Sequence, residues 1–107
     1  MSPQEISVTL SNDAAVVTLR GEHEAYTAEK LARSLRGLLD EGVSVCVDLR
    51  ETEFVDSTVV GTLLGARREA EQRRLRFALL LGERTGWPVR RLLQVTGLET
   101  QFELLSG

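Results

Sequence analysis

The residues best suited to do chemistry in this chain are Asp56, Ser57 and Thr58, which end an apolar segment and open a helix-like run. A hydroxyl at the start of a helix lies beside free backbone N–H groups and the positive end of the helix dipole, and both would stabilise an attached phosphate. Phosphorylation would add about −1.5 to −2 units of charge. The triplet therefore predicts a regulatory site. Because serine is a preferred N-cap residue, helix capping by Ser57 is the alternative.

Few other residues could support catalysis or metal binding. Cys46 is the only cysteine, which excludes an internal disulfide and a cysteine-based metal cluster, and its valine neighbours indicate a core position. His23 is the only histidine. It could lie near Ser57, but the chain has no G-x-S-x-G nucleophile elbow, no phosphate-binding glycine loop and no spaced carboxylate loop. We therefore expect no enzymatic activity, no metal and no cofactor.

Length and composition describe one soluble domain that spans residues 1–107. The chain is 42% hydrophobic and 27% charged, and a chain of this size can bury an unaided core. No stretch approaches the roughly 20 apolar residues of a membrane span, and residues 1–11 lack the pattern of a signal peptide. We expect a cytoplasmic protein with no membrane partner.

The net charge of −3 is unevenly distributed along the chain. Residues 1–56 hold eleven acidic and five basic side chains, whereas residues 57–107 hold five acidic and eight basic ones. An acidic protein does not favour nucleic acid as a partner. The arginines of the second half could form a local basic patch, but most fall on the expected solvent face of helices. No nucleic-acid partner is expected.

Period-two and β-branched patterns predict a sheet. Residues 6–10 and 15–19 flank two turn-forming residues, which indicates an antiparallel hairpin. Residues 43–49 and 76–81 are short apolar runs of the kind that parallel sheets bury on both faces. The segment 102–105 could form a last strand or a helical tail, and the pattern leaves both open.

Helical periodicity predicts three helices between these strands. Gly21 is expected to end the second strand of the hairpin, and Thr27 to cap a helix that ends near residues 40–42. A second helix is expected from Ser57 to about residue 74. A third begins at Trp87-Pro88 and stops before Gly97.

Gly61 and Gly65 lie on one face of the second predicted helix, at i, i+4 spacing. Each costs about 1 kcal/mol of helix propensity relative to alanine. That cost predicts a compensating role, either the close approach of another backbone within the fold or a smooth patch beside Ser57 for a partner. The two roles are compatible.

The element order β-β-α-β-α-β-α predicts an α/β domain. Its sheet should be mixed and mostly parallel, with about four to five strands, an N-terminal antiparallel hairpin and three or four helices. Right-handed crossovers bring the loops that follow parallel strands to one edge, which should gather residues 21–26, 51–58 and 82–87. Ser57 would then have mostly acidic neighbours: Glu22, His23, Glu24, Glu51 and Glu53.

Three regions of the chain resemble the STAS domains, a family named for sulfate transporters and anti-sigma factor antagonists. Residues 19–24 resemble its first-loop pattern L-x-G-E-L-D, and residues 47–64 its central run D-L-x-x-x-x-F-x-D-S-S-G-L-G-x-L-L. Residues 89–98 are similar to its C-terminal helix signature. The resemblance covers nearly the whole chain and is closest to the bacterial anti-sigma factor antagonists.

This resemblance implies that Ser57 is phosphorylated by a partner that is both an anti-sigma factor and a serine kinase. The unphosphorylated protein would bind this partner and release a sigma factor, and a phosphatase could restore that state. The residues expected to bind the partner surround the phosphorylated serine: Gly21, Glu22, His23, Glu24, Asp56, Ser57, Thr58, Val59 and Gly61.

The chain departs from the family pattern at Thr58-Val59-Val60, where the family prefers Ser-Gly-Leu. It also has His23 in place of an apolar residue and Glu24 in place of aspartate. Val59 replaces a glycine that would let a partner approach the backbone closely. These departures favour a second hypothesis, a STAS scaffold or adaptor that binds a partner without phosphorylation control. Small-ligand binding at the strand edge rests on fold analogy alone.

Overall fold

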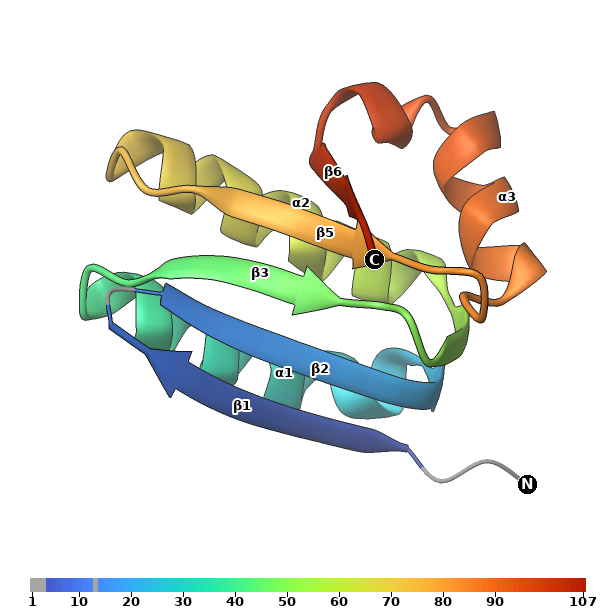
Figure 1. Cartoon of the computed structure of the whole chain (residues 1–107), viewed down its shortest axis with the longest axis horizontal. Coiled ribbons are helices and arrows are strands. Elements are labelled where there is room, and N and C mark those ends of the chain that lie inside the picture. The colour runs from blue at the N-terminus through green and yellow to red at the C-terminus, as the bar shows by residue number, and fades with distance from the viewer. Residues whose placement is uncertain (1–3, 13) are drawn as a thin grey trace.

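The computed structural model describes residues 4–12 and 14–107. Six strands form a sheet, and α1 and α2 lie side by side on one of its faces (Figure 1). The elements, in chain order, are β1 (Glu5–Ser11), β2 (Ala14–His23), α1 (Ala25–Asp40), β3 (Ser44–Asp48), β4 (Thr52–Val55), α2 (Ser57–Gln72), β5 (Phe77–Leu81), α3 (Trp87–Val95), the 3-10 helix η1 (Leu98–Thr100) and β6 (Glu103–Ser106).

The sheet has the strand order β1-β2-β3-β5-β6, and β4 pairs with the end of β2 outside this path. Only β1 and β2 are antiparallel, and every other pair is parallel. The predicted α/β class with a mixed, mostly parallel sheet and an N-terminal hairpin is confirmed. The open question about the tail is answered, because η1 leads into the strand β6, parallel to β5.

The strand β4 was not predicted, since its residues were expected to form a loop. Because β3 ends at Asp48, the last residues of β2 lack a neighbour on that side, and β4 pairs with them from Gly21 to His23. A strand of four residues is too short to show a clear period-two pattern. Its placement therefore depends on the tertiary fold.

Gly21 does not end β2, so that prediction is wrong. The strand continues to His23, and Gly21 adopts a positive φ of 84° at a register shift between Gly21 and Glu22. Glycine accepts this conformation without strain, and such an irregularity bends a strand. The bend lets β2 leave β3 and pair with β4.

Thr27 does not cap α1 either, because the helix begins at Ala25 and Glu24 is its N-cap residue. Thr27 is buried in the first turn, and its hydroxyl donates to the Glu24 carbonyl at 3.2 Å. The end of α3 follows the prediction, since the helix ends at Val95 and Gly97 has a φ of 72°.

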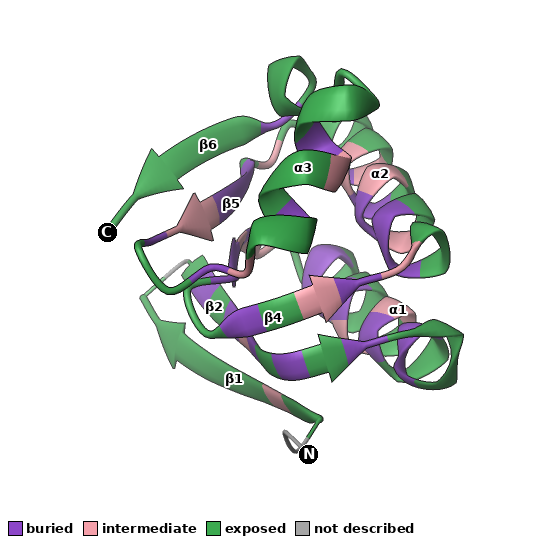
Figure 2. Ribbon diagram, turned by 90° about the vertical axis from the view of Figure 1, so that its right-hand side faces the viewer, coloured by how far each residue is buried: buried purple, intermediate pink, exposed green. Residues whose placement is uncertain are grey.

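The core lies between the sheet and the inner faces of α1 and α2, where Figure 2 shows buried positions along both layers. Cys46 is half-buried, and burial raises the pKa of its thiol. Burying one Val, Leu or Ile side chain contributes about 1.5–3 kcal/mol. The largest apolar side chains that are fully buried are Leu19, Leu31, Leu35, Leu39, Leu49, Leu63, Leu79, Val17, Val47, Val59 and Val89.

Within the described residues, no helix has both the length and the apolar character that crossing a membrane would require.

Gly86 holds β4 against the start of α3, and a substitution there should be costly. Its N–H donates to the Thr52 carbonyl at 2.7 Å, and a Cβ at this position would lie 2.1 Å from the Glu53 carbonyl oxygen. We expect Gly86→Ala to lower the free energy of unfolding by about 1–3 kcal/mol, the usual cost of overpacking. Urea denaturation measures this loss. The matched control is Gly37→Ala, whose Cβ would meet nothing within 4 Å. An unchanged Gly86→Ala midpoint would contradict the close contact.

Candidate functional site

The segment around Ser57 lies where β2 and β4 end side by side and lead into α1 and α2 (Figure 2). The backbone N–H of Asp56 donates to the His23 carbonyl at 3.1 Å, which ties the two strand ends together. The N-termini of both helices therefore open at one edge of the sheet. This geometry agrees with the expectation that residues 21–26 and 51–58 meet there. The third loop expected at this edge, residues 82–87, contacts residues 51 and 52 through Arg84 and Gly86.

The Asp56 carboxylate joins the two helix N-termini. Its Oδ1 accepts the N–H of Val59 at 3.0 Å, so Asp56 is the N-cap residue of α2. Its Oδ2 accepts the N–H of Ala25, the first residue of α1, at 3.0 Å. The positive ends of two helix dipoles thus face one negative charge, which stabilises the arrangement.

Ser57 is the first residue of α2, and its side chain is exposed. The prediction that Ser57 could serve as the cap is wrong, because Asp56 has that role. Among the hydrogen bonds of the described residues, none involves the Ser57 hydroxyl. The cap of α2 therefore does not depend on the Ser57 hydroxyl.

Two of the predicted partner-binding residues, His23 and Val59, have side chains that face the core. His23 is 1% exposed and Val59 is 0% exposed, so a partner cannot contact either side chain. The prediction that the side chains of His23 and Val59 bind the partner is therefore wrong. The reason for Val59 is helical geometry, since it lies two residues beyond Ser57 and points toward the sheet.

The His23 ring is held by two hydrogen bonds inside the fold. Its Nε2 donates to the Arg20 carbonyl at 2.8 Å, because a carbonyl oxygen can only accept, and its Nδ1 pairs with the Thr27 hydroxyl at 3.1 Å. Both nitrogens are engaged away from Ser57. This geometry leaves the imidazole no direct route to act as a base for the Ser57 hydroxyl.

The remaining predicted site residues differ in exposure. Gly21 is buried and Asp56 is half-buried. Both have a structural role at this edge, because Gly21 bends β2 and Asp56 joins the two helix starts. The predicted site residues that are exposed form the surface itself: Glu22, Glu24, Ser57, Thr58 and Gly61. We call these five residues, together with Tyr26, the Ser57 surface.

Tyr26 was not singled out by the sequence analysis, although it is the most exposed large side chain at this edge. It is the second residue of α1 and is 85% exposed. Its neighbour Ala25 is hydrogen-bonded to Asp56, which places Tyr26 beside the start of α2. A single aromatic residue at a helix start gives no clear sequence signal. An exposed tyrosine, however, is a frequent anchor in protein interfaces.

Gly61 and Gly65 are exposed, and a Cβ added to either would meet nothing within 4 Å. Close packing within the fold therefore does not explain them, and that part of the prediction is wrong. Neither residue has a positive φ. The other predicted role, a smooth patch beside Ser57 for a partner, stays a prediction.

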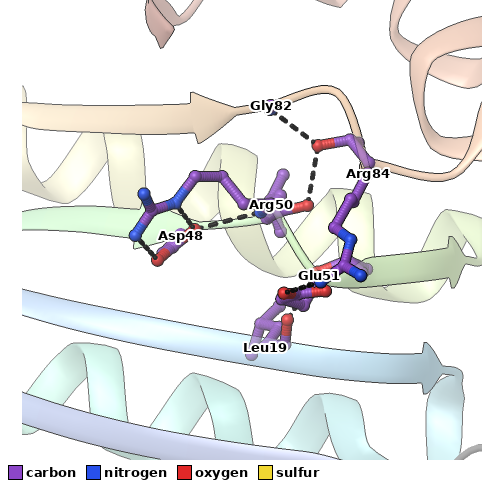
Figure 3. A network of polar contacts seen from close by, with 9 residues as sticks. Leu19, Asp48, Arg50, Glu51, Gly82 and Arg84 are labelled. Atoms are coloured by element: carbon purple, nitrogen blue, oxygen red, sulfur yellow. Dashed lines mark hydrogen bonds and ion pairs between the residues drawn. The ribbon is translucent and has the colours of Figure 1, made fainter. Parts of the chain in front are cut away.

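A second polar cluster lies on the sheet near the ends of β3 and β5 (Figure 3). Arg50 binds Asp48 through two side-chain bonds of 3.0 and 2.9 Å, and Arg84 pairs with Glu51 at 3.2 Å. Burial would raise the pKa of Asp48, but the hydrogen bonds and charge of Arg50 outweigh it and hold this pKa below its usual value.

These residues line an open cavity of about 460 Å³ that also includes Arg20. Arg20 is paired with Glu5 at 3.0 Å, so each of the three arginines has a carboxylate partner. The positive charge of each arginine in this cluster is therefore offset by a carboxylate. Within the described residues there is also no group of three potential ligands that could hold a metal ion.

Comparison with known proteins identifies relatives of this chain. A family model described as "Mlab, STAS domain" matches residues 6–106. The chain is similar to an anti-sigma-B factor antagonist of Listeria monocytogenes, with 33% identity over 90 residues that cover 82% of this chain and 75% of that protein.

Solved structures with the same fold include an anti-sigma factor antagonist from Mycobacterium paratuberculosis. It matches with a TM-score of 0.82 at 21% identity, over 96% of this chain and 86% of that chain. The Bacillus cell fate determinant SpoIIAA in its phosphorylated form matches with a TM-score of 0.77 at 22% identity, over 96% of this chain and 91% of that chain. At these identities the likeness shows the fold alone.

Unfolding experiments test whether Asp56, and not Ser57, caps α2. Asp56→Ala removes both acceptors, so we expect a loss of about 1–2 kcal/mol in the free energy of unfolding. Asp56→Asn keeps the cap to Val59 but loses the bond from Ala25, so its loss should be smaller. Ser57→Ala should stay within about 0.5 kcal/mol of the wild type. Chemical denaturation ranks the three variants, and a large loss in Ser57→Ala would assign the cap to Ser57 after all.

Proposed function

The chain belongs to the STAS domain family, and on that basis we propose that it is an anti-sigma factor antagonist controlled by phosphorylation of Ser57. In this proposal the unphosphorylated protein binds an anti-sigma factor through the Ser57 surface and so releases a sigma factor. The observation that carries it is the exposed Ser57 hydroxyl, free of hydrogen bonds within the described residues, on the first turn of a helix that Asp56 caps.

The chemistry of the Ser57 surface supports a protein partner with basic side chains at its contact region. Glu22, Glu24 and the half-buried Asp56 give this edge a negative charge. Complementary charge steers association and selects the partner. Tyr26 offers an exposed aromatic anchor, and Gly61 leaves the α2 backbone open to close approach. Together these groups suit a flat, well-packed contact around Ser57.

Phosphorylation would break this contact by charge and by size. The N-terminal N–H groups of α2 stabilise the phosphate where it forms, so no refolding is needed. In this proposal the partner's basic side chains face Glu22 and Glu24, and a carboxylate of the partner faces Ser57 itself. A phosphate charge about 5 Å from that carboxylate costs about 3 kcal/mol at an effective dielectric near 20, which corresponds to roughly a hundredfold in affinity. Exclusion of the bulky group from a tight interface adds to this effect.

The anti-sigma factor is proposed to be the serine kinase as well, and a phosphatase would return the protein to its binding form. SpoIIAA, which shares the fold, exists in unphosphorylated and phosphorylated forms. The valine that replaces the family's glycine is no obstacle, because Val59 is 0% exposed and does not stand between Ser57 and a partner. The substitution therefore leaves the approach to the hydroxyl open.

The second candidate is a STAS scaffold or adaptor that binds its partner without phosphorylation. The departure from the family pattern favours it at Thr58 alone, because Val59 and Val60 are buried. The same surface would serve both functions, since its exposure does not depend on a phosphate. The two candidates differ only in whether Ser57 is modified and whether modification changes binding.

Phosphorylation separates the two candidates directly. We expect the purified chain, incubated with its anti-sigma factor and ATP, to gain one phosphate, and Ser57→Ala to gain none. Thr58→Ala is the matched control, because Thr58 is the adjacent exposed hydroxyl, and it should be modified normally. Intact-mass spectrometry counts the phosphate, and calorimetry should record roughly a hundredfold weaker binding of the modified form. Equal affinity of both forms would favour the scaffold.

Gly61 offers a second test, because stability and binding should move in opposite directions. Gly61→Ala should raise the free energy of unfolding by up to about 1 kcal/mol through helix propensity, since the added Cβ meets nothing. The same methyl group should weaken partner binding severalfold. Gly37→Ala on α1 is the matched control and should stabilise the fold without affecting binding. If both variants bind as the wild type does, Gly61 is outside the contact.

A further inference from the structure

The outer edge of β1 is an open strand edge in the part of the chain that the structure describes. β1 pairs with β2 on one side, and none of the described strands pairs with its other side. Natural proteins protect such edges with lysine, proline or a β-bulge. The seven residues of β1 contain no lysine and no proline, and their pairing with β2 has no register shift. An unprotected edge of this length suits pairing with another strand.

The residues that face this edge follow from the hairpin geometry. Only two residues separate Ser11 from Ala14, and Asn12 has the positive φ, 51°, of a tight hairpin turn. In such a turn the Ser11 carbonyl accepts the Ala14 N–H, and hydrogen-bonded pairs then alternate along the ladder. Ser7 and Thr9 therefore bond to β2. The residues between and beside them point their N–H and C=O groups outward: Ile6, Val8 and Leu10.

The side chains of these three residues form an apolar strip on the face of the sheet that the helices cover. They lie opposite Leu19, Val17 and Ala15 of β2, which are all buried beneath the helices. β1 lies one strand further out, and Val8 and Leu10 are 44% and 63% exposed. Ile6 packs against the core. Free backbone groups and exposed apolar side chains thus coincide at one edge.

We propose that β1 pairs antiparallel with β1 of a second copy of this chain, about a two-fold axis at Val8. In this register Val8 meets Val8 of the other copy, and Ile6 meets Leu10 in both directions. Each of these pairs exchanges two backbone hydrogen bonds, which satisfies the outward groups of both strands. The apolar strips merge into one layer between the two α1 helices.

The register also brings no like charges together. On the opposite face Ser7 meets Thr9, and Glu5 meets Ser11, so no like charges oppose each other. Glu5 is already neutralised by Arg20 of its own chain at 3.0 Å. A contact in which the same strand serves both copies closes on itself, so assembly stops at the dimer through this edge.

A second copy is the occupant that this pattern favours over an unrelated peptide, because one register pairs apolar with apolar positions, pairs Ser7 with Thr9 and opposes no like charges. The strand is short, and an interface of this size corresponds to a weak and reversible dimer. The dimer does not depend on the phosphorylation of Ser57, because β1 contributes no residue to the Ser57 surface.

Sedimentation across a range of protein concentrations tests the proposal. The wild type should pass from monomer to dimer as concentration rises. Val8→Lys puts two like charges at the axis and should raise the dissociation constant at least tenfold, while the exposed position leaves the fold intact. The matched control is Leu105→Lys on β6, at the opposite edge of the sheet and 38% exposed, which should dimerise as the wild type does. A monomer at every concentration, or equal effects of both variants, would overturn the proposal.

Disulfide crosslinking tests the proposed register. A hydrogen-bonded antiparallel pair holds its Cα atoms about 5.5 Å apart, within the range that a disulfide spans. Val8→Cys combined with Cys46→Ser should therefore form an intermolecular disulfide under mild oxidation. Leu104→Cys in the same background should form none above the level of random collision. Equal crosslinking at both positions, or crosslinking at neither, would contradict pairing through β1.

Discussion

The site depends on the carboxylate of Asp56, which accepts hydrogen bonds from the first turns of two helices. One oxygen caps α2 through Val59, and the other holds the first residue of α1. The Asp56 N–H also binds the His23 carbonyl at the end of β2. Since free N–H groups at helix starts must find acceptors, one side chain fixes where both helices begin and how they meet. The edge on which Ser57 lies is a consequence of this junction.

This junction separates the structural role of Asp56 from the regulatory role proposed for Ser57. Because Asp56 provides the cap, the Ser57 hydroxyl can change its chemical state without removing a hydrogen bond on which the fold relies. A phosphate there would lie in the field of the helix that presents it, yet it would face the partner with new charge. The proposed switch therefore acts on the interface and leaves the domain intact, as a rigid scaffold for a modified residue requires.

The fold was largely predictable, because its main signals are local and repeated. The hairpin, the buried strands and the three helices follow from apolar periodicity over five or more residues. The missed strand β4 and the bend at Gly21 have no such signal, because each exists to complete the pairing of β2 after β3 ends. The cap of α1 was misplaced for the same reason, since the Ala25 N–H at the start of this helix bonds to Asp56 and the Glu24 side chain forms no cap.

The sequence by itself determined which groups were available: a serine after an aspartate at a helix start, acidic neighbours, two glycines on one helix face and one strand that alternates without lysine or proline. Only the tertiary structure decided which of them reach the surface. In the structure His23 and Val59 are buried, whereas Tyr26 and Gly61 are exposed. β1 lies at an open edge of the sheet. The physical reason is that burial depends on which elements pack together, and periodicity within one element cannot specify its neighbours.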